Sequence, residues 1–398
     1  MGKKILFYHW GALGDQAFEE SMRRNGVTCI DFTRKMKDYH GDGEFAREML
    51  EIIHSNQIDA VFSYDYFPLI SMLCEMNQLP YLSWIYDCPM NTLMSVTLSN
   101  KCNYIFCFDA SYAERLSEAG AVNIYHMPLG VEKNTLDSIA GREKEEPEII
   151  SKYQCEIACV GNLYNGERNR IRTAELSEYT RGYVEGLIKS QQLVYGYNLL
   201  ADSIRPEIVQ EIVEKCNLKL SDKYREDSVQ MAADAIGMEV TARDREDIIR
   251  VLSNRYPFAL YSSRPVAEEI KGKFLMEKGF ADYEKEMPFI FHNSKINLNI
   301  TSRTIQTGIP KRVLDILACG GFCLTNYQTE IAEYFEDGTD LVMYSGMGDL
   351  VAKVEYYLNH EEERRIIAEN GNRRVREVFD LDDKVGELLS AGQMTTNS

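Results

Sequence analysis

Short apolar runs rich in β-branched and aromatic residues recur through the N-terminal third of the chain, and amphipathic segments separate most of them. Two of these segments, at residues 44–54 and 111–119, have helical periodicity. Short apolar strands alternating with helices predict a parallel sheet covered on both faces, which is a Rossmann-like domain over residues 1–135. The apolar runs that we interpret as its strands lie at residues 5–8, 27–32, 58–63, 81–86, 104–108 and 123–127.

A second series of strand-like runs predicts a second domain of the same α/β class over residues 151–380. A charged stretch at 136–150 is interpreted as a linker, and residues 381–398 as a C-terminal tail. Two doubly wound domains would face a central cleft, because ligands of such sheets bind outside the carboxyl ends of the strands. The strand-like runs of the second series are found at residues 156–161, 258–262, 295–300, 322–325 and 341–344.

Residues 168–254 interrupt the second domain with helical patterns and few strand signals, so we interpret them as a helical insertion. Thr241-Ala-Arg-Asp244 is similar to a capping box and predicts that a helix begins there. Near the C-terminus, Asn370-Gly371 predicts the end of a helix that begins at residue 361.

Composition narrows the classes of ligand. The 398 residues are 44% apolar and 27% charged, with a formal net charge of −18. This charge disfavours binding to nucleic acid or to anionic lipid. The ten cysteines are spread thinly, several lie in apolar runs, and no histidine follows at zinc-site spacing, so we expect a reducing compartment and no metal. No apolar stretch has the length of a membrane span or of a signal-peptide core, and we expect a cytoplasmic protein.

The densest chemical signal lies between Ser294 and Asn326. It comprises a strand that ends at Thr301, a polar loop, and a helix that opens near Pro310. Free amide groups at that helix start, with Arg312 one turn later, predict a metal-independent site for a diphosphate. Asp315 is placed to accept hydrogen bonds from ribose hydroxyls. The alternative is that Arg312 and Asp315 pair with each other on a solvated helix face, and the spacing leaves both interpretations open.

The run from Gly308 to Asn326, with Ser294-Lys-Ile-Asn-Leu-Asn299 before it, resembles the C-terminal domain of CgeB-like (spore maturation type) glycosyltransferases of the GT-B fold. The resemblance extends to Trp84-Ile-Tyr-Asp-Cys-Pro89 in the first domain. It implies a nucleotide diphosphate sugar as donor, expected to be UDP-linked, and no other cofactor. By this resemblance an acidic residue at the Asp315 position contacts the donor ribose. The residues that would hold the diphosphate are Thr301, Ser302, Arg303, Gly308, Ile309 and Pro310.

The sequence departs from that family pattern at two positions. Asp315 replaces a glutamate and therefore reaches less far, and Lys311 stands where an apolar residue is expected.

In each domain, a glycine-containing loop follows the first strand. In His9-Trp-Gly-Ala-Leu-Gly-Asp15, the glycines at 11 and 14 do not form G-x-G-x-x-G, so no NAD site is predicted. Backbone amides of this cleft loop, which includes Trp10, Gly11, Gly14 and Asp15, are predicted to face the sugar diphosphate; a plain tight turn is the alternative. In the second loop, Gly161 and Asn162 would border the donor and Arg168 would neutralise phosphate, the alternative for Arg168 being a surface salt bridge.

Asp87 follows an apolar strand and precedes Cys88-Pro89. We predict that it deprotonates the acceptor hydroxyl if the transfer inverts the anomeric configuration. If the transfer is retaining, a donor phosphate takes that proton and Asp87 orients the acceptor. The alternative is a turn residue before proline without a chemical role. His9 and Asp15 are the alternative candidates for the base.

The sequence thus predicts a glycosyltransferase that moves a sugar from a nucleotide diphosphate to a hydroxyl acceptor on a protein or a surface glycan. A non-catalytic nucleotide-sugar or glycan-binding protein, and a nucleotide-sugar isomerase, are the alternatives with the same fold.

Overall fold

The computed structural model describes residues 2–218, 221–225 and 227–393. The chain divides into two compact units. The described residues of unit 1 belong to Met1–Glu132, Leu220–Glu226 and Phe379–Ser398, and those of unit 2 belong to Lys133–Lys219 and Asp227–Val378.

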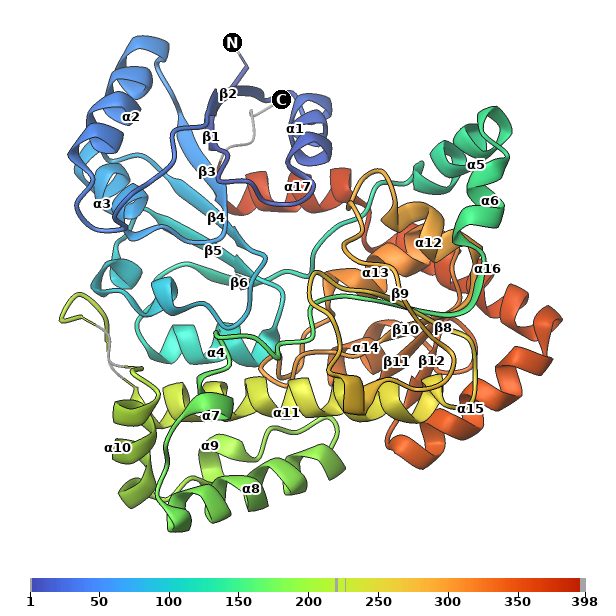
Figure 1. Cartoon of the computed structure of the whole chain (residues 1–398). Helices are drawn as coiled ribbons and strands as arrows, with labels where there is room; N and C mark the ends of the chain where they lie inside the picture. The colour runs from blue at the N-terminus through green and yellow to red at the C-terminus, as the bar shows by residue number, and fades with distance from the viewer. Residues whose placement is uncertain (1, 219–220, 226, 394–398) are drawn as a thin grey trace. The chain divides into compact units, whose positions relative to one another are not determined.

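Unit 1 is built on a six-stranded parallel sheet with the order β2-β1-β3-β4-β5-β6 (Figure 1). Its strands are β1 (Lys4–Tyr8), β2 (Thr28–Phe32), β3 (Ala60–Tyr64), β4 (Tyr81–Ile85), β5 (Asn103–Cys107) and β6 (Ile124–His126). Its helices are α1 (Asp15–Arg24), α2 (Gly43–Asn56), α3 (Pro68–Asn77), α4 (Ala110–Glu118) and α17 (Leu381–Ala391), with the 3-10 turns η1 (Asn91–Met94) and η2 (Val96–Ser99).

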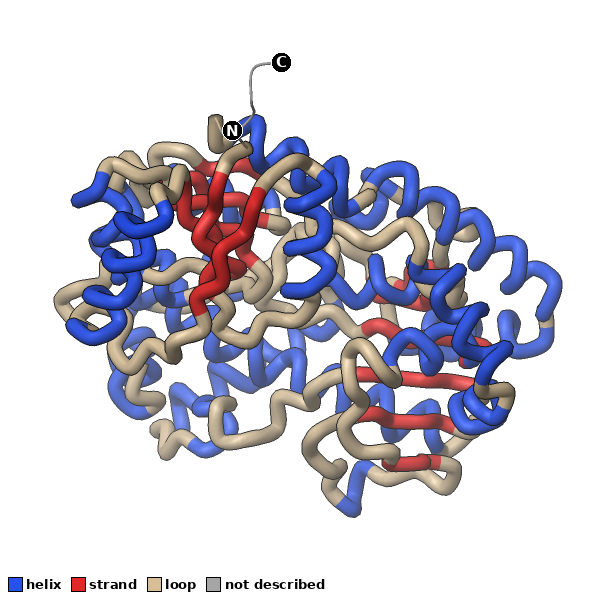
Figure 2. Tube along the Cα trace, turned by 90° about the horizontal axis from the view of Figure 1, so that it is seen from above, coloured by secondary structure: helices blue, strands red, loops and turns tan. Residues whose placement is uncertain are grey.

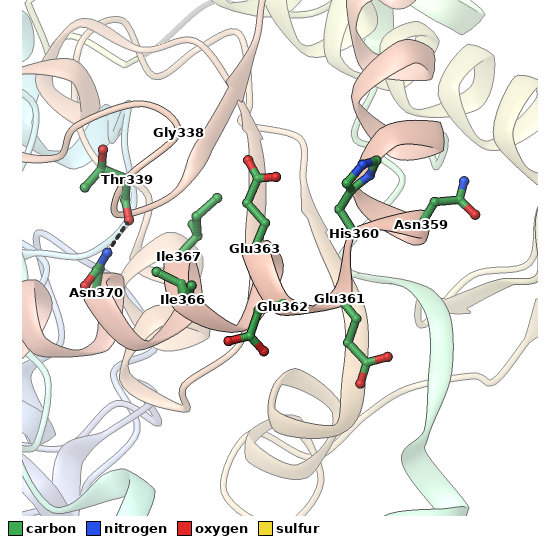
Figure 3. Close-up of a pocket in the computed structure, with 10 residues that line it drawn as sticks. All are labelled: Gly338, Thr339, Asn359, His360, Glu361, Glu362, Glu363, Ile366, Ile367 and Asn370. Atoms are coloured by element: carbon green, nitrogen blue, oxygen red, sulfur yellow. Dashed lines mark hydrogen bonds between the residues drawn. The ribbon is translucent and has the colours of Figure 1, made fainter.

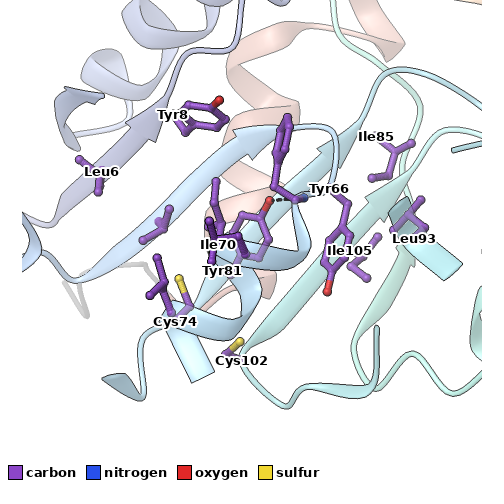
Figure 4. Packing of buried hydrophobic residues seen from close by; sticks show 14 of the residues in the cluster. Leu6, Tyr8, Tyr66, Ile70, Cys74, Tyr81, Ile85, Leu93, Cys102 and Ile105 are labelled. Carbon is purple, nitrogen blue, oxygen red and sulfur yellow. Dashed lines mark hydrogen bonds between the residues drawn. The ribbon is translucent and has the colours of Figure 1, made fainter. Parts of the chain in front are cut away.

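Side chains of unit 1 are buried on both faces of the sheet, as a parallel sheet requires. Alternation along β1 sends Tyr8 into the cluster drawn in Figure 4 and Phe7 to the opposite face. On that opposite face, Phe18 of α1 stacks on Phe62 of β3 with ring centroids 4.1 Å apart. The buried hydroxyl of Tyr81 forms a 2.7 Å hydrogen bond with Ser63, so the burial of this polar atom destabilises the fold little.

Unit 2 is built on a second six-stranded parallel sheet, with the order β12-β11-β10-β7-β8-β9. Figure 2 shows both sheets in red with helices packed against them. The strands are β7 (Cys155–Val160), β8 (Phe258–Tyr261), β9 (Leu275–Glu277), β10 (Ser294–Asn299), β11 (Cys323–Asn326) and β12 (Val342–Tyr344). The helices outside the insertion are α5 (Thr135–Glu145), α6 (Glu148–Tyr153), α12 (Met287–Asn293), α13 (Lys311–Ala318), α14 (Thr329–Tyr334), α15 (Met347–Asn359) and α16 (Glu361–Val378), with a 3-10 turn η3 (Glu268–Ile270).

The prediction of two doubly wound α/β sheets is confirmed, and each predicted strand agrees with an observed one to within two residues at either end. Strand β9 was not predicted, because it has three residues and two exposed side chains and therefore gives no apolar run. The stretch expected as a linker instead forms α5 and α6, which pack on α12: Tyr153 and Phe289 stack with ring centroids 6.2 Å apart.

The predicted insertion is helical and has an apolar core of its own. It comprises α7 (Arg170–Thr173), α8 (Glu178–Leu193), α9 (Leu200–Ser203), α10 (Pro206–Lys215) and α11 (Ser228–Ser253). The predicted helix start at Thr241 is wrong, because Thr241 lies inside α11, whose N-cap is Asp227. The Thr241 hydroxyl donates to the carbonyl of Gly237 at 2.8 Å, one turn earlier, instead of capping a helix.

Two predictions near the C-terminus also fail. Helix α16 continues past Gly371, and this glycine allows close contact with the carbonyl of Asp340 rather than ending the helix. The expected tail begins with α17, whose Val385 and Leu388 are buried in unit 1 against α1; residues 394–398 lie outside the described part. Within the described ranges, no helix is both long enough and apolar enough to cross a membrane.

Candidate functional site

The sheet of unit 2 reverses its winding between β7 and β10, which are neighbours although far apart in the chain. Loops that leave two such strands in opposite directions open a crevice at their carboxyl ends, and this is where doubly wound sheets bind ligands. Gly161 and Asn162 follow β7, and Thr301 closely follows β10. Three of the predicted donor residues therefore lie at the switch point of unit 2.

Arg312 reaches this switch point from the first turn of α13. The helix begins at Lys311, with Pro310 as an N-cap whose side chain makes no capping hydrogen bond. Gly161 has φ of +151°, and a methyl group built on it would lie 2.7 Å from Nη1 of Arg312. A glycine is required here because it leaves room for the guanidinium.

Asp315 does not pair with Arg312, so that alternative interpretation is not supported. Its carboxylate forms an ion pair with Lys311 on the same helix and accepts a 3.2 Å hydrogen bond from the hydroxyl of Tyr283. Lys311, the residue that departs from the family pattern, is thus the partner that Asp315 uses. The contact of Asp315 with a ribose stays a prediction.

Arg245, on α11 of the insertion, is a site residue that the sequence did not reveal. It is 7% exposed, and its guanidinium donates to the carbonyls of Asn162 and Ile300, the latter at 2.5 Å. These carbonyls follow β7 and β10, so Arg245 bridges the two strands of the switch point. In the sequence Arg245 is flanked by Asp244 and Glu246, and only its helical spacing from buried Ile248, Ile249 and Leu252 places it on the inner face.

Arg245 and Arg312 line one small cavity together with Gly161. The Nε atom of each is buried without a hydrogen-bond partner. Burial lowers the pKa of Arg245 below its usual value, and the nearby charge of Arg312 lowers it further. Among the residues that the structure describes, neither arginine forms an ion pair with a carboxylate. One buried and one partly buried positive charge without an anionic partner favour the binding of an anion.

The loop after β10 is tied to α11 by its own side chains. The backbone amide of Arg303 donates to Thr241 Oγ1 at 2.8 Å, and its Nε lies 2.7 Å from Oδ2 of Asp244. The guanidinium carbon also lies 4.1 Å from the ring centroid of Tyr195. Arg303 is therefore committed to protein partners, and its geometry argues for anchoring the loop instead of binding phosphate.

The remaining predicted donor residues lie around the same strand ends. Thr301 is buried, and its amide donates to Asn326 Oδ1 at 2.7 Å. The hydroxyl of Ser302 is 2.8 Å from that of Thr304. The other three are Gly308 and Ile309, which are buried before α13, and Arg168, which is exposed in the loop before α7.

The sheet of unit 1 reverses its winding between β1 and β3. His9 follows β1, with Nδ1 3.0 Å from Asp15 Oδ2 and Nε2 3.1 Å from Asp31 Oδ1. Burial lowers the pKa of His9, but the hydrogen bonds to the two carboxylates outweigh it and the pKa is raised. Because a ring with an acceptor at both nitrogens favours the imidazolium, which has no lone pair for a proton, this geometry argues against His9 as the base.

Asp65, which follows β3, is a second residue that the sequence did not reveal. It is 1% exposed, and its Oδ1 accepts hydrogen bonds from the amides of Tyr86 at 2.8 Å and Asp87 at 3.0 Å. Burial raises the pKa of Asp65 to about 7, with a contribution from the charge of Asp87. The buried carboxyl group of Asp65 therefore holds the loop that carries Asp87 by its backbone amides. The side chain of Asp87 itself is exposed.

The cleft loop of unit 1 is shaped by its glycines. Gly11 has φ of +98° and Gly14, the N-cap of α1, has φ of +82°, both in the left-handed region. Trp10, directly before Gly11, donates from Nε1 to the carbonyl of Tyr64 at 2.9 Å. The contact of this loop with a diphosphate stays a prediction.

A separate hollow lies in unit 2, beside the edge strand β12 and away from the switch point. Figure 3 shows it between the loop that precedes β12, with Gly338 and Thr339, and the start of α16. Three glutamates at 361–363 carry negative charge there. The hollow lies at the amino side of β12, so it is distinct from the switch point.

Comparison with known proteins bears on two points: the fold of the whole chain, and the family to which part of the sequence is similar. Residues 243–390, which include Arg245 and Arg312, match a family model described as glycosyl transferase-like. No curated protein matches the sequence. A glycosyltransferase from Rickettsia africae is 12% identical, with a TM-score of 0.53 and 100% of both chains covered.

Two further solved structures have the same fold. Anabaena HepE in complex with UDP-glucose is 10% identical, with a TM-score of 0.56, 98% of this chain and 100% of that chain covered. The sucrose-phosphate synthase of Thermosynechococcus elongatus is 10% identical, with a TM-score of 0.56 and 98% of each chain covered. The two parallel sheets with their flanking helices are therefore those of a GT-B fold.

Proposed function

From a GT-B fold that contains a glycosyl transferase-like region, we propose that this protein transfers a sugar from a nucleotide diphosphate, expected to be UDP-linked, to a hydroxyl acceptor. The complex of the structurally similar HepE with UDP-glucose supports UDP as the first nucleotide to test. The CgeB-like resemblance of the run from Gly308 to Asn326 supports the same reaction class.

The observation that carries this proposal is the pair of guanidiniums, Arg245 buried and Arg312 partly buried, at the switch point of unit 2. When the bond between the sugar C1 and the diphosphate oxygen breaks, negative charge builds up on the leaving diphosphate. Arg245, Arg312 and the uncapped amides at the start of α13 offset that charge where it develops. These groups supply the stabilisation from protein atoms, and we propose that no metal is needed.

Asp87 is the proposed base of an inverting transfer. The acceptor oxygen bonds to C1, the bond from C1 to the phosphate oxygen breaks, and the acceptor proton moves to the Asp87 carboxylate. In a retaining transfer a phosphate oxygen of the donor receives that proton. The role of Asp65 is the same in both, because its Oδ1 holds the amides of residues 86 and 87.

Isothermal titration calorimetry with UDP, GDP, ADP and the corresponding glucose conjugates tests the donor site. We expect binding of at least one diphosphate. Gly161→Ala should weaken it, since the new methyl group would lie 2.7 Å from Nη1 of Arg312 and would displace the guanidinium. Arg365→Ala is the matched control, because this arginine is exposed on α16 and pairs with glutamates of its own helix.

Lack of binding by all these nucleotides, or equal affinity of the Gly161→Ala variant, would refute the donor site. Release of free sugar from the donor without an acceptor would separate an enzyme from a non-catalytic binding protein. Conversion of the sugar while it remains on the nucleotide would identify an isomerase.

A further inference from the structure

Three aromatic side chains follow three adjacent strands of unit 1. Trp10 follows β1, Tyr39 lies in the loop after β2, and Phe67 follows β3. The ring centroids of Trp10 and Phe67 are 6.3 Å apart, and those of Tyr39 and Phe67 are 5.8 Å apart. We call these three residues the aromatic ledge. Because β1 and β3 flank the switch point, the ledge lies where a doubly wound sheet binds its ligand.

Two of the three rings of the ledge are open to solvent. Phe67 is buried, but Trp10 is 39% exposed and Tyr39 is exposed as well. The indole Nε1 of Trp10 is already bonded to the carbonyl of Tyr64, which holds the ring in place. A ring that is fixed before binding loses little entropy when a ligand stacks on it.

A second pair of rings involves His40, the residue after Tyr39 in the chain. His40 lies edge-on to Tyr224 with ring centroids 4.9 Å apart. Tyr224 belongs to the short segment 221–225, which the insertion contributes to unit 1. The amide of Val96 donates to the carbonyl of Lys223 at 3.0 Å and fixes this segment against unit 1. Exposed rings on two separate strand-end loops suit an extended ligand better than a single small molecule.

Several carboxylates lie at the same end of the sheet as the ledge. Asp31, more than half exposed, and Asp15 hydrogen-bond His9 on the α1 face of the sheet, opposite to the ledge, and exposed Asp87 lies on the loop after β4. These groups accept hydrogen bonds from hydroxyls and repel anions. A carbohydrate offers both an apolar face of C–H groups for stacking and a rim of hydroxyls, and an uncharged one avoids the repulsion.

We propose that the aromatic ledge binds an uncharged oligosaccharide, so that the acceptor in the proposed transfer is a glycan and not a peptide side chain. The role as acceptor rests on the proposed function, whereas the binding of the oligosaccharide does not. Trp10 and Tyr39 stack on successive sugar rings.

Tryptophan fluorescence reports on the ledge directly, because the chain has two tryptophans and Trp84 is 0% exposed. The full chain is titrated without nucleotide against trisaccharides of glucose, galactose, mannose and N-acetylglucosamine, and against a serine-rich peptide. We expect at least one trisaccharide to change the emission and to reduce acrylamide quenching. Trp10→Ala should weaken that binding about tenfold or more, as measured by calorimetry.

Leu13→Ala is the matched control, since Leu13 is 45% exposed in the same loop and carries no ring. It should bind the trisaccharide like the wild type, and Tyr39→Ala should weaken binding with the fold intact by circular dichroism. Binding of none of the trisaccharides, equal binding by the Trp10→Ala variant, or binding of the peptide in their place would overturn the proposal.

The failure of this inference can be distinguished from that of the proposed function. If nucleoside diphosphates bind and trisaccharides do not, the glycan site is wrong and the donor site remains. If trisaccharides bind and no nucleotide does, the transferase proposal falls while the carbohydrate site stands.

Discussion

The two sheets have their switch points between equivalent kinds of strands, yet the side chains at these points have opposite chemistry. In unit 2, buried Arg245 and partly buried Arg312 bring two positive charges to the ends of β7 and β10. In unit 1, the ends of β1 and β3 carry aromatic rings and carboxyl groups, including exposed Trp10 and buried Asp65. Parallel topology determines where a ligand binds, and the residues at the strand ends determine which ligand it is.

Under the proposed function, this difference matches each proposed substrate to one unit by charge. A diphosphate gains from the guanidiniums of unit 2, whereas the carboxylates of Asp15, Asp31 and Asp87 in unit 1 would repel it. A neutral glycan gains little from buried arginines but stacks on exposed rings. Variants at one switch point should therefore change one binding step and leave the other unchanged.

The largest expected effect is on turnover, from Asp87→Asn. If Asp87 removes the acceptor proton, kcat should fall by about 10²- to 10⁴-fold, the usual contribution of a general base. The affinity for the nucleotide should be unchanged, because the variant alters only unit 1. Glu118→Gln at the exposed end of α4 is the control in steady-state assays. An unaltered kcat would remove Asp87 from the proton transfer.

The next effect is on donor affinity, from Arg312→Ala. Loss of a charge-assisted hydrogen bond to phosphate should weaken binding of the nucleoside diphosphate by about 1.5 to 3 kcal/mol. Titration calorimetry measures this change, and binding of the trisaccharide serves as the internal control because it should not alter. Full donor affinity in the variant would contradict the assignment of the anion site.

A smaller effect concerns the pH dependence of stability, from Asp65→Asn. Burial raises the pKa of Asp65 to about 7, so the folded protein holds a proton that the unfolded chain releases near its ordinary pKa of 3.8. The wild type therefore loses stability as the pH rises from about 4 towards 7, while the asparagine variant does not titrate there.

Between pH 5.5 and 7, the free energy of unfolding of Asp65→Asn relative to wild type should rise by about 1.5 kcal/mol. Denaturant titrations at the two pH values measure it. The same offset at both values would show that Asp65 does not hold a proton in the folded protein.

The sequence was sufficient for the strands and for the residues that follow them directly. Apolar runs marked all strands but β9, and Gly161, Asn162 and Asp87 were identified because they stand where such runs end. Their placement is confirmed because the carboxyl ends of parallel strands share one edge of a sheet, so position along the chain already implies position in space; their roles stay predictions.

The sequence was not sufficient where a long-range contact decides the role of a side chain. Arg245 is far along the chain from Asn162, whose carbonyl it binds, and its charged neighbours give it the pattern of an exposed helix. Arg303 was predicted to bind phosphate from its position in the loop before α13. Nothing in that loop indicates that Asp244 is its partner. The predicted helix end at Gly371 is wrong for a similar reason, because the contact of Gly371 with Asp340 is not visible in the local sequence.

The smallest expected effect also probes the acidic side of the comparison, through His9→Gln. Burial lowers the pKa of His9, but its hydrogen bonds with Asp15 and Asp31 raise the pKa above the ordinary 6.5. The stabilisation is complete below pH 6.5 and is lost as the pH rises through the pKa of the folded state. His9→Gln should therefore lower the free energy of unfolding by about 1 kcal/mol at about pH 5.5 and by less at about pH 8.5, as measured by denaturant titration. A deficit that grows with pH would mean that His9 is neutral in the folded protein and could act as the base after all.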